Sequence, residues 1–443
     1  MPWNSATDVS VPKILEKGFV VFALLYMARG VIPVVAAQSD ESQLGEFNAI
    51  SFTIQALVFV ILGALIFVQR QSILPGITNS GLLLSLCGLA IASAAWSSEP
   101  VFTLRRGILL LATTILGIYV GSRFDWDEQL NLFAWMGVVS VVGSFLMVFL
   151  LPQYGLSHDM HWGNWKGLFP HKNALGQQMD FAILTFAIGK PKGLPRGVLS
   201  ASLAGAALLL FLSHSMTSIA LAAVIACAYP ILWLVRLKKR RTLPLWVPLV
   251  PVFAAVAWFI ASNSGAILDI LGRDSTLTGR RDLWPAVIDA IKERPLFGYG
   301  YAVFWRWGLS GDARDLLTSI HWNGIMQAHN GYLELCLDLG LSGLLLFVWG
   351  FVAAARRAMK LFHREPNRAT RWAVMYLLFF ALYNLFEGSL MQLYTFLWVP
   401  YVSVFVSLAL MEAADQRERE ADLSPSTDEQ SGAEMAPVTA GGR

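Results

Sequence analysis

Long apolar stretches separated by short polar connections make up most of this chain. A helix that crosses a membrane needs ~20 consecutive, mostly apolar residues, and twelve stretches meet or approach that length. The predicted membrane-spanning helices cover approximately residues 18–37, 50–69, 80–96, 103–121, 130–151, 173–189, 197–213, 217–235, 245–262, 331–355, 371–387 and 389–412. Because their number is even, we expect both termini on the same side of the membrane.

The longest polar interruption separates the ninth predicted span from the tenth, at residues 262–330. It contains arginines, aromatic residues and glycines, and it ends on His329 and Asn330, where the tenth span begins. The sequence thus predicts a single all-α, polytopic membrane domain over residues 1–412, with this long loop inserted between its ninth and tenth helices. Residues 413–443 have too little apolar surface to fold, so we expect a disordered tail there.

Composition leads to the same class of protein. Hydrophobic residues make up 56% of the chain and charged residues only 14%, whereas soluble domains carry about 25% charged residues. The mean hydropathy is +0.55. A net charge of +3 is too small to indicate binding to nucleic acid. The expected surroundings are therefore membrane lipid.

The distribution of positive residues in the short loops predicts the orientation. On the side of the termini, Lys and Arg gather within residues 190–196, 236–241 and 356–371. The opposite side receives the loops at residues 38–47, 162–171 and 262–330. Because positive loops stay in the cytoplasm, we expect the termini to be cytoplasmic and the long loop to be external.

No cofactor or metal is indicated by the sequence. The cysteines all lie within apolar stretches, at Cys87, Cys227 and Cys336, so neither a disulfide framework nor a metal motif is formed. Nothing fixes His158, Asp159 and His161 in the geometry that catalytic zinc requires. The chain also lacks a Walker A motif and a Rossmann fingerprint, which argues against ATP-driven transport.

His329 and Asn330 stand where the long loop re-enters the membrane. Asn330 is a favourable N-cap, so we expect the tenth helix to begin here with the positive end of its dipole outward, where it attracts phosphate groups. Glu334 and Asp338 follow on one helix face, ~6 and ~12 Å below the cap. Ionisable residues at membrane depth are candidates for function. Glu334 contacts either substrate or an arginine that holds the loop, whereas Asp338 is best explained structurally.

Basic residues on the external side run against the usual charge bias. They are Arg105, Arg106, Lys172, Arg273, Arg280, Arg281, Lys292, Arg294, Arg306 and Arg314. A guanidinium presents a planar fork that matches phosphate oxygens, so such a cluster suits a lipid diphosphate. Arg105, Arg280 and Arg281 are the stronger candidates because each adjoins a helix end or an aromatic run. Aromatic residues of the loop, such as Trp284 and Tyr299, could stack on sugars or belong to the aromatic belt of any membrane protein.

Three motifs resemble the O-antigen ligase and polysaccharide polymerase superfamily, and more closely its exopolysaccharide polymerase branch. The first is His329-Asn330 followed by Gly340 and Gly343. The second runs from Thr278 to Trp284 and continues at residues 295–300; the third is Gly167 to Gly176. With Trp96 to Pro100 and Leu104 to Arg106, the resemblance spans roughly residues 80–345. These features are shared by polymerases and ligases.

The resemblance implies a metal-independent, inverting glycosyltransferase with a GT-C-like membrane fold and short helices in its periplasmic loop. Its donor would be an undecaprenyl-diphosphate-linked oligosaccharide, used at the periplasmic face of a bacterial inner membrane. Carried over to this chain, His329 and Arg280 would be catalytic. Substrate binding would fall to Arg281, Arg105, Lys172, Asn330, Glu334, Trp284 and Tyr299.

Three functions are compatible with these residues. A polymerase would transfer the glycan onto a lipid-linked repeat unit, together with a chain-length regulator and a flippase as partners. A ligase would transfer it to the lipid A core. A flippase would perform no chemistry and would be expected to carry charges along a central cavity, whereas here the charges gather in one loop and at helix ends. This distribution favours an enzyme.

Overall fold

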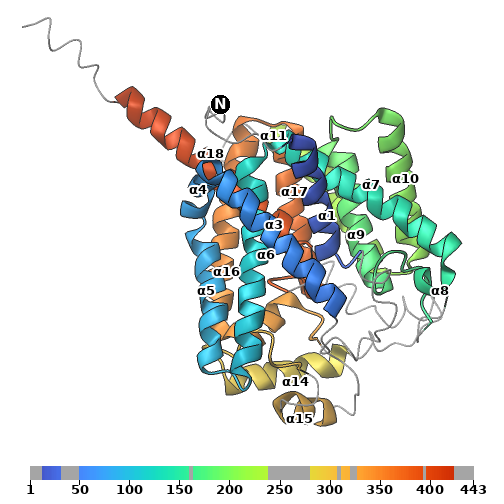
Figure 1. Cartoon of the computed structure of the whole chain (residues 1–443), viewed down its shortest axis with the longest axis vertical. Coiled ribbons are helices and arrows are strands. Elements are labelled where there is room, and N and C mark those ends of the chain that lie inside the picture. The colour runs from blue at the N-terminus through green and yellow to red at the C-terminus, as the bar shows by residue number, and fades with distance from the viewer. Residues whose placement is uncertain are drawn as a thin grey trace, which may run out of the picture.

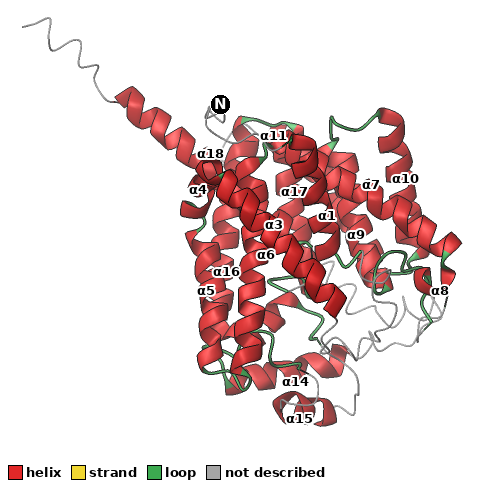
Figure 2. Cartoon of the chain, viewed as in Figure 1, coloured by secondary structure: helices red, strands yellow, loops and turns green. Residues whose placement is uncertain are grey.

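The structure, a computed structural model, describes residues 12–30, 49–158, 163–237, 280–306, 311–319, 327–392 and 396–423. Within these ranges the secondary structure consists of helices joined by turns and loops, apart from one isolated bridge between Leu156 and Trp165 (Figure 2). The helices are α1 (Lys13–Met27), α3 (Ala49–Val68), α4 (Arg70–Thr78), α5 (Gly81–Ala92), α6 (Pro100–Arg123), α7 (Trp126–Leu150), α8 (Pro152–Gly155), α9 (Lys172–Leu184), α10 (Arg196–Leu212), α11 (Met216–Leu237), α14 (Arg280–Glu293), α15 (Gly311–Ser319), α16 (Gly331–Arg364), α17 (Arg368–Phe386) and α18 (Trp398–Leu423).

The molecule is a polytopic membrane protein by the length and composition of its helices. Among the described residues, six helices are long and apolar enough to cross a membrane, namely α3, α6, α7, α16, α17 and α18. A seventh span results if α4 and the following helical segment, which meet at a bend of 79°, are counted as one. Two shorter apolar helices, α10 and α11, stand in the same bundle (Figure 1). The number of twelve stays a prediction, and its ninth span, 245–262, lies outside the described residues.

Three predicted elements differ from the observed ones. The first span, predicted over residues 18–37, corresponds to α1, which begins at Lys13 and already ends at Met27. The tenth span, predicted as one helix, contains a break at Gly340, where φ is 65° and ψ is −163°. The last span, predicted over residues 389–412, begins only at Trp398 and continues to Leu423. Residues 413–423 are therefore helical where a disordered tail was predicted. At the start of this extension Asp415 forms a half-exposed ion pair with Arg364, at the end of α16.

Close helix packing fixes the centre of the bundle. Gly117 and Gly121 on α6 face α18 so closely that a methyl group would come within 2.5 Å of the Val402 side chain or 2.6 Å of the Ser403 carbonyl. Small residues allow this approach, which is how membrane helices associate without a hydrophobic driving force. The Trp398 indole donates a hydrogen bond to the Thr114 hydroxyl across the same interface, at 2.9 Å.

An aromatic cluster joins α7, α9 and α17. The Phe181 ring of α9 lies 5.5 Å from Phe133, 6.1 Å from Trp372 and 5.7 Å from Tyr376, measured between ring centroids. Phe396, which precedes α18, completes the cluster at 4.9 Å. Edge-to-face contacts of this kind add to the free energy of burial. They hold α9 and α17 in fixed register, and residues of the candidate site lie on α9 and directly after α17.

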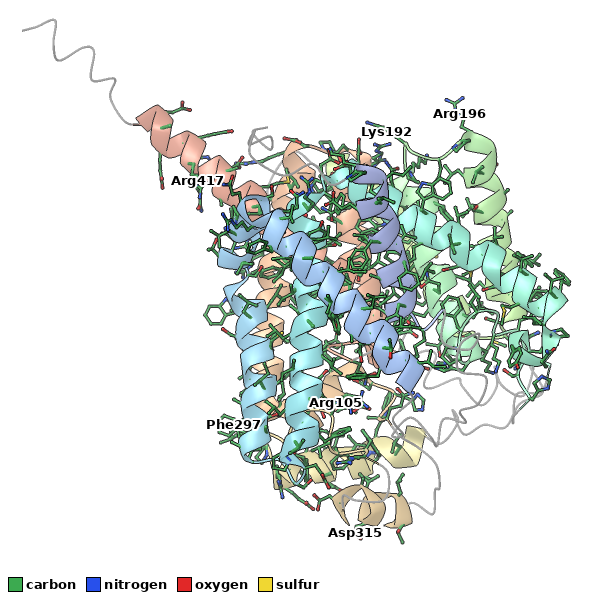
Figure 3. All side chains as sticks on the ribbon, in the orientation of Figure 1. Arg105, Lys192, Arg196, Phe297, Asp315 and Arg417 are labelled. Atoms are coloured by element: carbon green, nitrogen blue, oxygen red, sulfur yellow. The ribbon has the colours of Figure 1, made fainter. Side chains whose placement is uncertain are left out.

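The two ends of the bundle have different character. Lys192, Arg196 and Arg417 lie at one end, whereas Arg105, Phe297 and Asp315 lie toward the other (Figure 3). Helices α14 and α15 of the long loop cover that second end (Figure 1). This arrangement agrees with the alternation of loops predicted from the sequence. Which end faces the periplasm stays a prediction.

Candidate functional site

The tenth predicted helix, α16, begins directly after the predicted capping residue Asn330. Asn330 is the N-cap of α16, and its side-chain oxygen accepts hydrogen bonds from the N–H groups of Tyr332 and Leu333, at 3.0 and 3.1 Å. Its amide nitrogen donates to the carbonyl of Leu385, at 3.1 Å, near the end of α17. The predicted cap is confirmed. It also fastens the beginning of α16 to the end of α17.

The break in α16 is filled by residues 295–300 from the long loop. The N–H groups of the last two residues of this segment donate to the carbonyls of Leu337 and Asp338, at 2.8 and 3.0 Å. The N–H of Leu341 donates in return to the carbonyl of the first residue, at 2.8 Å. Because the break at Gly340 would otherwise leave these main-chain groups unpaired, the loop segment replaces the missing helical hydrogen bonds. The first helical piece of α16 and the loop therefore form one rigid unit.

Two motifs of the resemblance meet at this unit. The Trp96 indole donates to the carbonyl of Phe297, at 3.1 Å, and the Ser93 hydroxyl accepts from the N–H of Tyr301, at 2.9 Å. Arg306 forms an ion pair with Glu99 at 2.6 Å. The turn before α6 is thus joined to the long loop.

His329 lies at the centre of a network of polar side chains. Its Nδ1 is 3.1 Å from the Oε2 atom of Glu387, which is 5% exposed. The Oε1 atom of Glu387 accepts a hydrogen bond from the Asn173 amide, at 3.2 Å. The Ser215 hydroxyl donates to the Asn173 side-chain oxygen, at 3.0 Å. Four separate segments of the chain therefore supply this network.

The network lies where three helices begin. α9 starts at Lys172, α11 at Met216 and α16 at Gly331, so each N-terminus adjoins a residue of the network. Helix N-termini carry partial positive charge, which favours anions, and at α16 and α9 the side chains of Asn330 and His171 cap part of the N–H groups. Lys172 adds a full charge and is only 8% exposed. Three helix N-termini and Lys172 thus bring positive charge to this region, against the carboxylate of Glu387 at the C-terminal end of α17.

Glu334 serves the loop that carries His329. One carboxylate oxygen accepts a hydrogen bond from the N–H of Ala328, and the other accepts from the Trp305 indole at 2.9 Å. Its side chain is buried, with the residue 4% exposed. These partners are a main-chain group and an indole rather than the arginine that one of the two sequence interpretations proposed. Asp338 also holds the loop, since its Oδ1 accepts from the N–H of Ala302 at 3.0 Å.

The other site residues predicted from the sequence lie in different surroundings. Arg280 and Arg281 begin α14, but their side chains lie outside the described part of the chain. The Trp284 indole donates to the carbonyl of Ala328, at 2.9 Å, so it supports the loop beside His329. Arg105 is exposed on α6, with its guanidinium 5.9 Å above the Phe52 ring.

Tyr299 is a packed side chain rather than an exposed ring. It is 4% exposed, and its hydroxyl donates to the carbonyl of Ala290 at 2.9 Å and lies 3.0 Å from the carboxylate of Glu293. Burial raises the pKa of Tyr299, and the neighbouring Glu293 raises it further. In this structure its ring contacts Phe304 and Arg294. No face of the ring is open to stack on a sugar.

Three residues of the network were not selected from the sequence: Glu387, Asn173 and Ser215. Glu387 had a detectable signal, because it is the only acidic residue within the mostly apolar residues 371–411. Asn173 lies within the motif from Gly167 to Gly176, which was noted without a role for this residue. Ser215 carried no such signal, since hydroxyls are common at helix N-termini.

Comparison with known proteins bears on the same residues. The family model described as O-antigen ligase matches residues 201–348, a range that contains His329, Asn330 and the break at Gly340. The exopolysaccharide production protein ExoQ of Rhizobium meliloti (strain 1021) is 29% identical over 331 residues, covering 71% of this chain and 74% of that protein. The resemblance to the O-antigen ligase and polysaccharide polymerase superfamily is confirmed. The family match includes Ser215 but neither Asn173 nor Glu387.

Proposed function

We propose that this protein is an exopolysaccharide polymerase that transfers an undecaprenyl-diphosphate-linked glycan onto a lipid-linked repeat unit. The observation that carries the proposal is the position of His329, where the N-termini of α9, α11 and α16 meet. Such a site offers a proton acceptor next to an anion-binding surface. Similarity to a family described as O-antigen ligase and to an exopolysaccharide production protein supports this choice.

The proposed reaction is a metal-independent displacement with inversion at the sugar. An acceptor hydroxyl attacks the anomeric carbon, the bond from that carbon to the diphosphate oxygen breaks, and the lipid diphosphate leaves with the electron pair. His329 accepts the proton of the hydroxyl. The helix N-termini, Lys172 and Arg280 stabilise the negative charge that develops on the leaving group, with Arg281 and Arg105 as further contacts. Fixed positive groups would fill the role that a divalent metal has in other glycosyl transfers.

The proposed setting is the bacterial inner membrane, with the site at the periplasmic face. The site lies toward the end of the bundle that α14 and α15 cover, and this is the end predicted to be external (Figure 1). A chain-length regulator and a flippase are proposed as partners, because a polymerase needs repeat units delivered across the membrane and its product length controlled.

A ligase is the second candidate, because the matching family model bears that description. It would use the same donor and the same leaving group but a lipid A core acceptor. A flippase without chemistry is a weaker candidate, since the described polar network is centred on a histidine at one end of a helix rather than on a central cavity.

A deletion strain distinguishes these functions. If the protein is a polymerase, its loss abolishes high-molecular-weight exopolysaccharide, and single repeat units accumulate on the lipid carrier outside the cytoplasm. If full-length polymer persists and is missing only from lipid A, the protein is a ligase. Accumulation of repeat units on the cytoplasmic face would instead indicate a flippase.

A further inference from the structure

We infer that Glu387 is the positioning residue of His329: it accepts a hydrogen bond from Nδ1–H and thereby keeps Nε2 as the proton-accepting atom. The inference rests on the proposed function and extends it to a residue outside the matched range 201–348. Its basis is the 3.1 Å separation between His329 Nδ1 and Glu387 Oε2.

The protonation pattern follows from the chemistry of the two groups. An ionised carboxylate only accepts hydrogen bonds, whereas a neutral imidazole has one N–H and one lone pair. For the contact to Glu387 to be a hydrogen bond, Nδ1 of His329 must carry the hydrogen. Nε2 then holds the lone pair that a general base requires.

The Gln327 side chain also contacts Nδ1 of His329, but this contact does not change the tautomer. Its side-chain amide nitrogen is placed 3.3 Å from Nδ1 of His329. An amide N–H cannot donate to a nitrogen whose hydrogen already points to Glu387, but rotating the amide by half a turn presents its oxygen instead. The contact to the carboxylate is shorter and charge-assisted, so Glu387 decides the tautomer.

Glu387 is itself held in one orientation. Its second oxygen accepts from the Asn173 Nδ2 group at 3.2 Å, and Asn173 Oδ1 accepts from the Ser215 hydroxyl at 3.0 Å. The amide therefore has its nitrogen toward the carboxylate and its oxygen toward the hydroxyl, and each donor has one acceptor. This chain of hydrogen bonds fixes the plane of the carboxylate and hence the direction of the imidazole ring.

The main chain of His329 is fixed as well. Its φ angle is 51°, in the left-handed region that residues with a side chain rarely adopt. The preceding residue, Ala328, is held by Glu334, and the following residue, Asn330, is the N-cap of α16. A strained residue persists only where its neighbours determine its conformation. Both the backbone and the ring of His329 are therefore set before substrate binds.

The buried charge of Glu387 has a source of compensation. Glu387 is the C-cap of α17, at the negative end of that helix, and the N-termini of α9, α11 and α16, which adjoin Asn173, Ser215 and His329, bring partial positive charge that offsets its charge. In the reaction, the acceptor oxygen bonds to the anomeric carbon, its proton moves to Nε2, and the diphosphate takes the electron pair of the broken bond. The imidazolium that results lies against the carboxylate, which stays ionised and stabilises it.

The test measures turnover and KM for a lipid-linked repeat unit with the purified full-length protein in detergent. Glu387→Gln keeps the size of the side chain but removes the charge, and we expect turnover to fall by about 100-fold or more while KM stays unchanged. Glu387→Asp retains the carboxylate and should recover part of the activity. Asn173→Ala, which leaves the carboxylate in place, should lose less than Glu387→Gln.

The outcomes separate this inference from the proposed function. If His329→Ala is inactive and Glu387→Gln turns over at the wild-type rate, Glu387 has no positioning role and the proposed site stands. If His329→Ala keeps full activity, the proposed site itself is wrong. Equal losses in Glu387→Gln and Glu387→Asp, together with a lowered melting temperature in both, would show a merely structural role and overturn the inference.

Discussion

The carboxylate of Glu334 accepts a hydrogen bond from the Trp305 indole at 2.9 Å, and it thereby joins the first turn of α16 to the interior of the long loop. Its other oxygen accepts from Ala328, the residue that precedes His329. A buried carboxylate with two N–H donors fixes the loop more firmly than an exposed ion pair does, because water does not compete for either donor.

Removal of this carboxylate should displace His329. In Glu334→Ala the N–H of Ala328 is left without its acceptor, which costs about 1–3 kcal/mol for a buried group. We expect a lower melting temperature in detergent and a loss of polymer synthesis. Glu334→Gln should be intermediate, since an amide oxygen satisfies only one of the two donors. Asp289→Asn on α14 is the control, because its ion pair with Lys292 is exposed, and it should behave as wild type. An active and stable Glu334→Ala protein would contradict the assignment.

The break in α16 predicts a sharp difference between two glycines. Gly340 has a φ of 65°, and a methyl group there would overlap the main chain of Leu296. Gly340→Ala should therefore destabilise the protein by about 1–3 kcal/mol or more. Gly88 lies within α5 with open space beside it, so Gly88→Ala is the matched control and should be neutral or slightly stabilising. The melting temperatures of both variants are measured by heating the protein and monitoring the loss of the folded peak in size-exclusion chromatography. Equal melting temperatures would contradict the observed break.

Orientation in the membrane is tested by single cysteines in a background that lacks the three native ones. Asp315 and Arg196 are exposed and lie at opposite ends of the bundle (Figure 3). If α15 is periplasmic, Asp315→Cys reacts with an impermeant maleimide in intact cells, whereas Arg196→Cys reacts only after the cells are broken. The reverse pattern would place the proposed chemistry in the cytoplasm.

The diphosphate site is tested at the first residue of α14. Arg280→Lys keeps the positive charge but loses the planar fork. We expect the loss mainly in turnover, on the order of 2–4 kcal/mol by analogy with the removal of one oxyanion donor. The double variant with His329→Ala should be hardly worse than the worse single variant, because groups that act together are not additive. Lys292→Gln on the same helix, whose ion pair is exposed, should be unaffected.

Metal independence is tested separately with the purified wild-type protein. Because fixed arginines and helix N-termini are proposed to stabilise the leaving group, activity should persist in excess EDTA. Inhibition by EDTA that a divalent ion reverses would overturn this part of the mechanism.

Local chemistry let the sequence determine the class of the protein and several of its elements. Apolar stretches of sufficient length predicted membrane helices, and a favourable capping residue at Asn330 predicted where α16 begins. Both signals depend only on neighbouring residues. His329 was selected for the same reason, since it precedes that cap. The motifs at Trp96 and at residues 295–300 were found as patterns, without an indication that they touch.

Tertiary structure alone decided which side chains meet His329. Glu387 follows His329 by 58 residues in the sequence, and Asn173 precedes Glu387 by 214 residues. No local pattern therefore relates these residues. The break at Gly340 was also hidden, because α16 is uninterrupted in hydropathy and the segment that fills the gap comes from the preceding loop. Pairing between distant segments depends on how helices pack. The sequence therefore determined the class of membrane helices, the start of α16 and one end of the site, and packing supplied the partners.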